Sequence, residues 1–560
     1  MASEAPEEGR LFNTTAPPTR PEPGGLVLGE QTGQCQLTDD ITQLLDTVPL
    51  TDSDGPDWIG DAAEFGTLFS DLSPMFMPPD EQPDLPPLIG SLGSVGAAHN
   101  SAETGGNVQD SQSWLLPTDK PYNMESSLPE HGAFGWQGQL DACDDSPESI
   151  GSVFIHRICE ALCISEAPCG NPWRQIVWPL AQQHLALYHA VAAMTCFNGL
   201  PRLRAEGLKH LETSIQKLST SHSQQNKMSP EVTATTLLVL AMAQTWYYPR
   251  SYNGTIHLKK ARGLIQALFT NFAAQPAEEL PNLRFLANTW MYMDVLTRIT
   301  CPNDQSGDLD LVVDLTFPSS NPEGDSDAHV DPLMGCANTL FPLIGRVADL
   351  VARVRRDPQK TNSPTIVSIG TELLAAIDRW TPSLPLSDLP AKTEETARAT
   401  PATSDLVQTA NAYKWATLLL LYQTVPELPF RLSYAGIARK VLVYIATVPL
   451  SSKAVFFPIF PLMVAGCEAT DAEDRLWVRN RWHSLSSLNS SGIADRCLEL
   501  TMEVWARRDD AAFELFPSPK SRAVGSEVEF ELDREALIKS EMHWLSVMRD
   551  WGWEGMLYSG

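Results

Sequence analysis

The chain has 560 residues and a formal net charge of −29 at pH 7, so it is long enough for one large domain and an additional segment. Residues 1–150 hold 26 acidic residues against three basic ones, whereas the rest of the chain is close to neutral. Because an acidic segment is repelled by nucleic-acid phosphates, this charge distribution excludes residues 1–150 as a DNA-binding surface. The uneven charge favours a protein that binds other macromolecules over an enzyme.

Residues 1–150 are predicted to be a disordered, acidic and Pro-rich segment. Runs such as "APPTRPEPGG" and "FMPPDEQPDLPPLIG" interrupt any helical periodicity, and the segment cannot bury enough apolar area to offset its conformational entropy. The first residues carry neither a basic nor an apolar run, so we expect no secretory signal peptide.

Two stretches of this segment, "DITQLLDTVPLTD" and "DWIGDAAEFGTLFSDLSPMF", place large apolar side chains among carboxylates. This pattern is typical of an activation region that docks on the transcription machinery or a coactivator as short induced helices. The alternative is a solubilising tail, which does not need tryptophan and phenylalanine at this density. The predicted anchors of the activation region are Leu44, Leu45, Trp58, Phe65, Phe69 and Phe76.

Residues 151–560 are predicted to form an all-α domain, a large array of packed helices with one core. In "MSPEVTATTLLVLAMAQTW", Ser229 suits the N-cap, Pro230 the first helical position and Glu231 the positive end of the helix dipole. The Pro- and Thr-rich stretch 379–405 is predicted to be a long surface loop.

The stretch "GTIHLKKARGLIQAL" contains three basic residues within four positions. Helical spacing places Leu258, Ala261, Ile265 and Leu268 on one apolar face. The lysines are therefore predicted to be solvated surface rather than a DNA contact. Similarly, the arginines of "ARVRRDPQK" end a predicted helix, where cations suit the negative end of the dipole.

The apolar stretch 441–466 is interrupted by Ser451, Ser452, Lys453 and three prolines. We therefore expect two buried helices and no membrane span. The ten cysteines form no CxxC pair, and we expect reduced thiols without a disulfide framework.

From the residues that could carry chemistry, we predict no catalytic residue, no cofactor and no metal site. The densest cluster comprises His156, Cys159, Cys163 and Cys169, but Cys159 and Cys163 lie one helical turn apart on an apolar face and are predicted to be core residues. Asp144 and Asp145 are the strongest acidic pair for an alternative function, a helical isoprenoid cyclase that holds magnesium and pyrophosphate. Pro147 disfavours a helical conformation at Ser146 and weakens that alternative.

A set of segments between about residues 172 and 557 resembles the fungal-specific transcription factor domain, which follows the zinc binuclear cluster in many fungal regulators. The segments that carry most weight are "HLKKARGLI" and "AGCEATDAEDR", and "DPLMGCANTLFPLIGRVADL" is among the other matching segments. The residues that match the family's motifs are His257, Leu258, Ala261, Ile265, Gly335, Gly466, Glu468 and Arg475.

The resemblance implies a nuclear regulator of RNA polymerase II transcription that controls a metabolic or secondary-metabolite pathway. The family's zinc cluster uses six cysteines among basic residues, but residues 1–150 contain only Cys35 and Cys143. DNA contact is therefore expected through a DNA-binding partner or through a zinc cluster missing from the given sequence. A homodimer is one further expectation, and a non-catalytic helical scaffold remains an alternative.

Overall fold

The computed structural model describes eleven ranges of the chain, and the following account concerns these alone. They are 144–164, 170–223, 228–247, 254–272, 280–301, 330–359, 361–382, 401–429, 432–489, 491–515 and 536–554. Within them the fold is all-α, as predicted, with no strand beyond a single bridge between Asp331 and Gly335. Residues 1–143 of the segment predicted to be disordered lie outside the described residues. The prediction is wrong for residues 147–150, which belong to helix α4 (Pro147–Val153) and include the buried Ile150.

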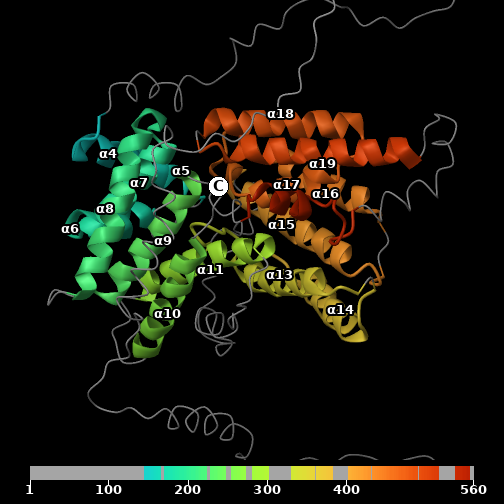
Figure 1. Ribbon diagram of the computed structural model, residues 1–560, viewed down its shortest axis with the longest axis horizontal. Coiled ribbons are helices and arrows are strands. Elements are labelled where there is room, and N and C mark those ends of the chain that lie inside the picture. Colours follow the sequence, from blue (N-terminus) through green and yellow to red (C-terminus); the bar gives the residue numbers. More distant parts are fainter. Residues whose placement is uncertain are drawn as a thin grey trace, which may run out of the picture. The chain divides into compact units, whose positions relative to one another are not determined.

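The first half of the described chain forms seven α-helices, with two π-helical segments, Phe154–Ile158 and Trp173–Val177. The α-helices are α4 (Pro147–Val153), α5 (Cys159–Ala161), α6 (Trp178–Gln183), α7 (Leu185–Asn198), α8 (Arg204–Ser223), α9 (Pro230–Tyr247) and α10 (Gly254–Phe272). Helix α7 packs against both α8 and α9, and α9 packs against α10 (Figure 1). Helix α9 is buried on every side from Val232 to Trp246, and α7, α8 and α10 pack around it.

The second half continues from α11 to α21. Its helices are α11 (Leu280–Thr300), α13 (Phe341–Arg356), α14 (Pro364–Arg379), α15 (Pro401–Thr424), α16 (Tyr434–Ala446), α17 (Ile459–Cys467), α18 (Ala472–Leu488), α19 (Ile493–Leu515) and α21 (Trp544–Trp551). Helix α11 packs against α10 and α13, and α15 packs against α16 and α17. Helices α18 and α19 lie side by side (Figure 1), and α19 also contacts α17 and α21.

Local sequence signals place several helix boundaries correctly. Helix α9 begins at Pro230, and the Ser229 hydroxyl accepts a hydrogen bond from the Val232 amide at 3.3 Å, as predicted. Helix α13 ends at Arg356, which confirms the structural role assigned to the arginines there. No described helix is both long enough and apolar enough to cross a membrane.

The apolar stretch 441–466 lies in two helices, as predicted, but only α17 is buried throughout. Helix α16 buries one face and leaves Val443 exposed. The predicted surface loop 379–405 is wrong at its end, because α15 already begins at Pro401. Proline suits the first turn of a helix, where its missing N–H costs nothing. Residues 383–400 of that loop lie outside the described residues.

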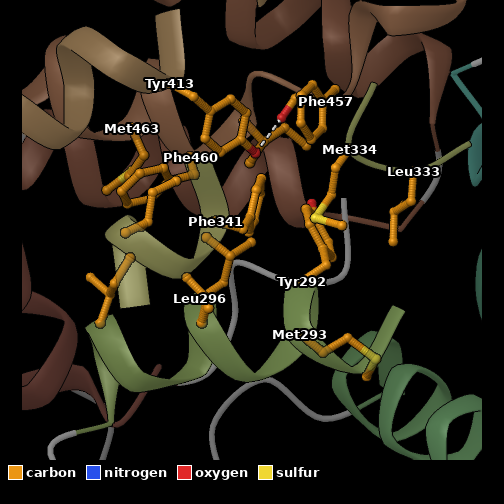
Figure 2. Packing of buried hydrophobic residues seen from close by; sticks show 14 of the residues in the cluster. Tyr292, Met293, Leu296, Leu333, Met334, Phe341, Tyr413, Phe457, Phe460 and Met463 are labelled. Carbon is orange, nitrogen blue, oxygen red and sulfur yellow. Dashed lines mark hydrogen bonds between the residues drawn. The ribbon is translucent and has the colours of Figure 1, made fainter. Parts of the chain in front are cut away.

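An aromatic cluster joins the helices of the second half (Figure 2). The Tyr413 ring of α15 stacks on Phe457 with ring centroids 4.5 Å apart, and it lies 5.4 Å from Phe341 at the start of α13. Tyr292 of α11 lies 5.5 Å from Phe341. The Tyr413 hydroxyl donates a hydrogen bond to the Phe457 carbonyl at 2.8 Å, so its polar end is satisfied inside the core.

A tight turn at residues 331–335 places Leu333 and Met334 beside this cluster (Figure 2). The Asp331 side chain accepts hydrogen bonds from the Leu333 and Met334 amides at 2.9 and 2.7 Å, and Gly335 closes the turn with a φ of +57°. A Cβ atom at Gly335 would lie 2.9 Å from the Ile164 side chain. Both the backbone conformation and the available space therefore favour glycine.

Two glycine substitutions test this account of the turn. We expect Gly335→Ala to lower the free energy of unfolding by about 1–3 kcal/mol, because alanine is strained at positive φ. Gly263→Ala is the matched control, since Gly263 lies within α10 and nothing is within 4 Å of its added Cβ. It should stabilise the protein by about 0.5–1 kcal/mol. Urea unfolding measures both, and equal effects of the two substitutions would contradict the assigned role of Gly335.

Candidate functional site

A buried ion pair between Glu468 and Arg508 is the centre of the strongest polar site in the described chain. The two guanidinium Nη atoms donate to the two carboxylate oxygens at 2.7 and 2.8 Å, and the residues are 3% and 7% exposed. Arg508 also donates to the Cys467 carbonyl at 3.1 Å. Bidentate geometry and these further bonds offset the cost of removing both charges from water.

The ion pair continues into a hydrogen-bonded network. The Gln423 amide Nε2 donates to Glu468 at 2.8 Å, and its Oε1 lies 3.3 Å from His543 Nε2. Because Oε1 only accepts, His543 carries its proton on Nε2, while its Nδ1 accepts from the Leu545 amide at 3.2 Å. Burial, followed by the positive charges of Arg508 and Arg355, holds the pKa of His543 well below its ordinary value. His543 is therefore a neutral cap of α21.

The network fixes the C-terminal segment 536–554 to the helices that precede it. The Ile538 amide donates to the Gln423 carbonyl at 3.0 Å, and Arg507 of α19 donates to Asp550 at 3.0 Å. Arg355 of α13 donates to the Leu545 carbonyl at 3.4 Å. Residues far apart in the sequence are thus held around one buried carboxylate.

The three family-motif residues of the "AGCEATDAEDR" stretch meet at one interface with α19. The Trp505 indole donates to the Gly466 carbonyl at 3.0 Å, next to the ion pair of Glu468. Arg475 binds Asp509 through two hydrogen bonds of 2.6 and 2.9 Å and donates to the Ala469 carbonyl at 2.8 Å. This part of the motif joins the α17–α18 connection to α19, and its role is structural.

The family-motif residues of α10 form a second buried group. Leu258, Ala261 and Ile265 are buried, as the helical spacing predicted, whereas Leu268, the fourth residue of the predicted face, is only partly buried against the core. The Leu258 carbonyl accepts a hydrogen bond from the Trp290 indole of α11 at 2.9 Å. The prediction of solvated lysines holds for Lys259 but is wrong for Lys260, whose amine is buried. Lys260 lies one helical turn after the buried His257, on the same side of α10.

His257 is the least expected member of this group. It is 3% exposed, and neither ring nitrogen has a hydrogen-bond partner. Burial, with a smaller contribution from Lys260, lowers its pKa to about 4. The ring is therefore neutral at physiological pH, and its packing contributes more than any hydrogen bond.

The candidate metal and magnesium residues have structural roles where they are described. Cys159 and Cys163 are buried, as predicted, and burial raises the pKa of Cys159 to about 12.

Asp144 accepts hydrogen bonds from Ser146 and Ser149 at the start of α4, whereas Asp145 lies 2.8 Å from His210 Nε2. Among the described residues, no three histidine, cysteine or acidic side chains are grouped so that they could hold a metal ion. His156 is exposed, and Cys169 lies outside the described ranges.

The predicted anchors of the activation region all lie outside the described residues. These are Leu44, Leu45, Trp58, Phe65, Phe69 and Phe76.

The sequence alone did not identify the partners of the motif residues. Gln423, Trp505, Arg508 and His543 lie tens of positions from Glu468 in the sequence, and no spacing rule links them to it. Trp505 and Arg508 are three residues apart on α19, which places both on one helix face and is the one signal available.

The buried ion pair should dominate stability. We expect Glu468→Ala to lower the free energy of unfolding by about 3–5 kcal/mol, because Arg508 would remain buried without its partner. The double substitution Glu468→Met with Arg508→Met should recover most of this loss. Urea unfolding measures both. As a control, Arg439→Ala removes an exposed residue that pairs with Asp474 and should leave the midpoint nearly unchanged. The interpretation is wrong if Glu468→Ala is as mild as this control.

Because His257 is buried in its neutral form, we expect the folded protein to lose stability in acid. Below pH 6.5 the unfolded chain protonates this histidine, whereas the folded chain does so only near pH 4. Its contribution to stability is therefore lost as the pH falls between these values, by about 3 kcal/mol in total. Denaturant unfolding between pH 7 and 4 should show a shallower pH dependence for His257→Gln than for the unsubstituted protein. His483→Gln, which changes an exposed residue of α18, should keep the original slope. An unchanged slope in His257→Gln would contradict the prediction.

Comparison with known proteins gives one family match. The family model described as the fungal specific transcription factor domain matches residues 150–558. Neither a curated protein nor a solved structure matches the chain.

Proposed function

Since the chain belongs to the family of the fungal specific transcription factor domain and is thus a regulator of fungal transcription, we propose that it acts in the nucleus through two regions. The family match confirms the resemblance found in the sequence. The first region is residues 1–150, which we propose as an acidic activation region. The second is residues 151–560, which we propose as the regulatory domain that receives a signal or a partner.

The uneven charge is the observation that carries the activation proposal. Residues 1–150 combine a charge of −23 with aromatic side chains in two acidic stretches. Carboxylates keep these apolar groups solvated until a coactivator groove accepts them. The motif residues of the helical domain stabilise its fold and form no reactive group, which favours a regulatory role over a catalytic one. Both acidic residues that an isoprenoid cyclase would need are engaged at the start of α4.

DNA contact is proposed to occur through a DNA-binding partner or through a zinc cluster encoded upstream of residue 1. The genomic and transcript sequence upstream of Met1 distinguishes the two cases. An in-frame six-cysteine cluster would remove the need for a partner. The regulated pathway is proposed to be metabolic, as the family implies, and transcript profiling of a deletion strain tests this.

A tethering experiment tests the activation region. Residues 1–150 fused to a heterologous DNA-binding domain should activate a reporter gene. Replacing Trp58, Phe65, Phe69 and Phe76 by alanine should abolish most of the activity, because the acidic residues that remain have no apolar group to dock. The matched control replaces Trp114, Leu115 and Leu116, which lie outside the two acidic stretches, and should retain activity. A fusion that fails to activate, or equal losses in both variants, would refute the assignment.

A further inference from the structure

Two histidines and a carboxylate form a chain of hydrogen bonds at the start of the helical domain. The Nδ1 atoms of His189 on α7 and His210 on α8 lie 2.8 Å apart, and Asp145 Oδ1 lies 2.8 Å from His210 Nε2. Asp145 comes two residues before α4, and α4 packs against α7. The side chains of His210 and Asp145 are 12% and 44% exposed, so protons from solvent reach the chain.

The hydrogen bonds determine where the protons lie. A carboxylate only accepts hydrogen bonds, so His210 carries a proton on Nε2. When His210 is neutral, its Nδ1 accepts from His189, and when His210 is charged, its Nδ1 donates to His189. Both states keep the contact of 2.8 Å between the rings, whereas two charged rings would place two N–H groups face to face. The pair can therefore hold one additional proton but not two.

The surrounding charges favour His210 as the ring that takes this proton. Burial, followed by the positive charges of His210 and Lys217, lowers the pKa of His189 to about 4. His210 instead faces the carboxylate of Asp145. On α9, which packs against α7 and α8, the stretch Val232–Trp246 has no titratable side chain.

The other titratable groups near the chain belong to α4, α7 and α8. They are Glu148, Tyr188, Cys196 and Glu206. Histidine is the one side-chain type in this set that ordinarily changes its charge between pH 5 and 8. The histidine pair thus decides how the charge beside Asp145 depends on pH in this range.

We propose that this chain is a proton-dependent latch, in which the first proton taken up by the histidine pair converts the Asp145–His210 hydrogen bond into an ion pair. Hydrogen bonds between charged groups are stronger than those with one neutral partner. Mild acidification therefore holds the start of α4 more firmly at α8. The helix itself covers a small buried cluster of Ile150, Ala192 and Cys196, which opens when α4 detaches. The latch lies where residues 1–143 join the described domain, and it does not depend on the proposed activation region.

Hydrogen–deuterium exchange of the full chain, read on the peptide that spans α4, tests the latch. Each variant is compared with the unsubstituted protein at the same pH, so the intrinsic pH dependence of exchange cancels. Asp145→Asn should accelerate exchange about twofold at pH 7.5, because the amide oxygen still accepts the hydrogen bond. At pH 5.5 the acceleration should be about tenfold, because the ion pair is lost. An equal acceleration at both pH values would overturn the proposal.

Two further variants identify the group that titrates. Asp144→Asn is the matched control, since hydrogen bonds from the hydroxyls of Ser146 and Ser149 hold the pKa of Asp144 at about 2. Its effect on exchange should be the same at pH 7.5 and 5.5. In a His210→Gln background, Asp145→Asn should also act equally at both pH values. If the larger effect at pH 5.5 persists in that background, His210 is not the proton acceptor and the latch is wrong.

Discussion

The Glu468–Arg508 ion pair is the constraint on which the second half of the helical domain depends. A buried carboxylate and a buried guanidinium offset the cost of leaving water when they pair with good geometry and make further hydrogen bonds. Glu468 meets this requirement with Arg508 and Gln423, and the network extends through Gln423 to His543. Helices α15, α17 and α19 and the start of α21 must therefore take one fixed arrangement. Because each partner in the network occupies one position on its helix, the network favours a single register of these helices.

The "AGCEATDAEDR" stretch, which carries part of the family resemblance, belongs to the same set of contacts. Gly466, Glu468 and Arg475 contact α19 through a carbonyl, a carboxylate and a guanidinium respectively. The contacts of these three residues with α19 are structural.

Much of the fold followed from sequence patterns because helices are local structures. Ser229 and Pro230 marked the start of α9, and helical spacing placed Leu258, Ala261 and Ile265 in the core. The patterns failed where a neighbour in space decides the outcome. Lys260 was expected in water, but the tertiary structure buries its amine. Pro401 was expected in a loop, yet it is equally suited to the first turn of α15.

The sequence by itself therefore determined the all-α class, several helix positions, the uneven charge and the family. It did so because periodicity, capping and composition involve residues within a few positions of each other. Only the tertiary structure decided which partners Glu468 and Arg475 have, and that His257 is buried without a hydrogen bond. These contacts join residues of different helices, far apart in the sequence, and their geometry depends on how whole helices pack.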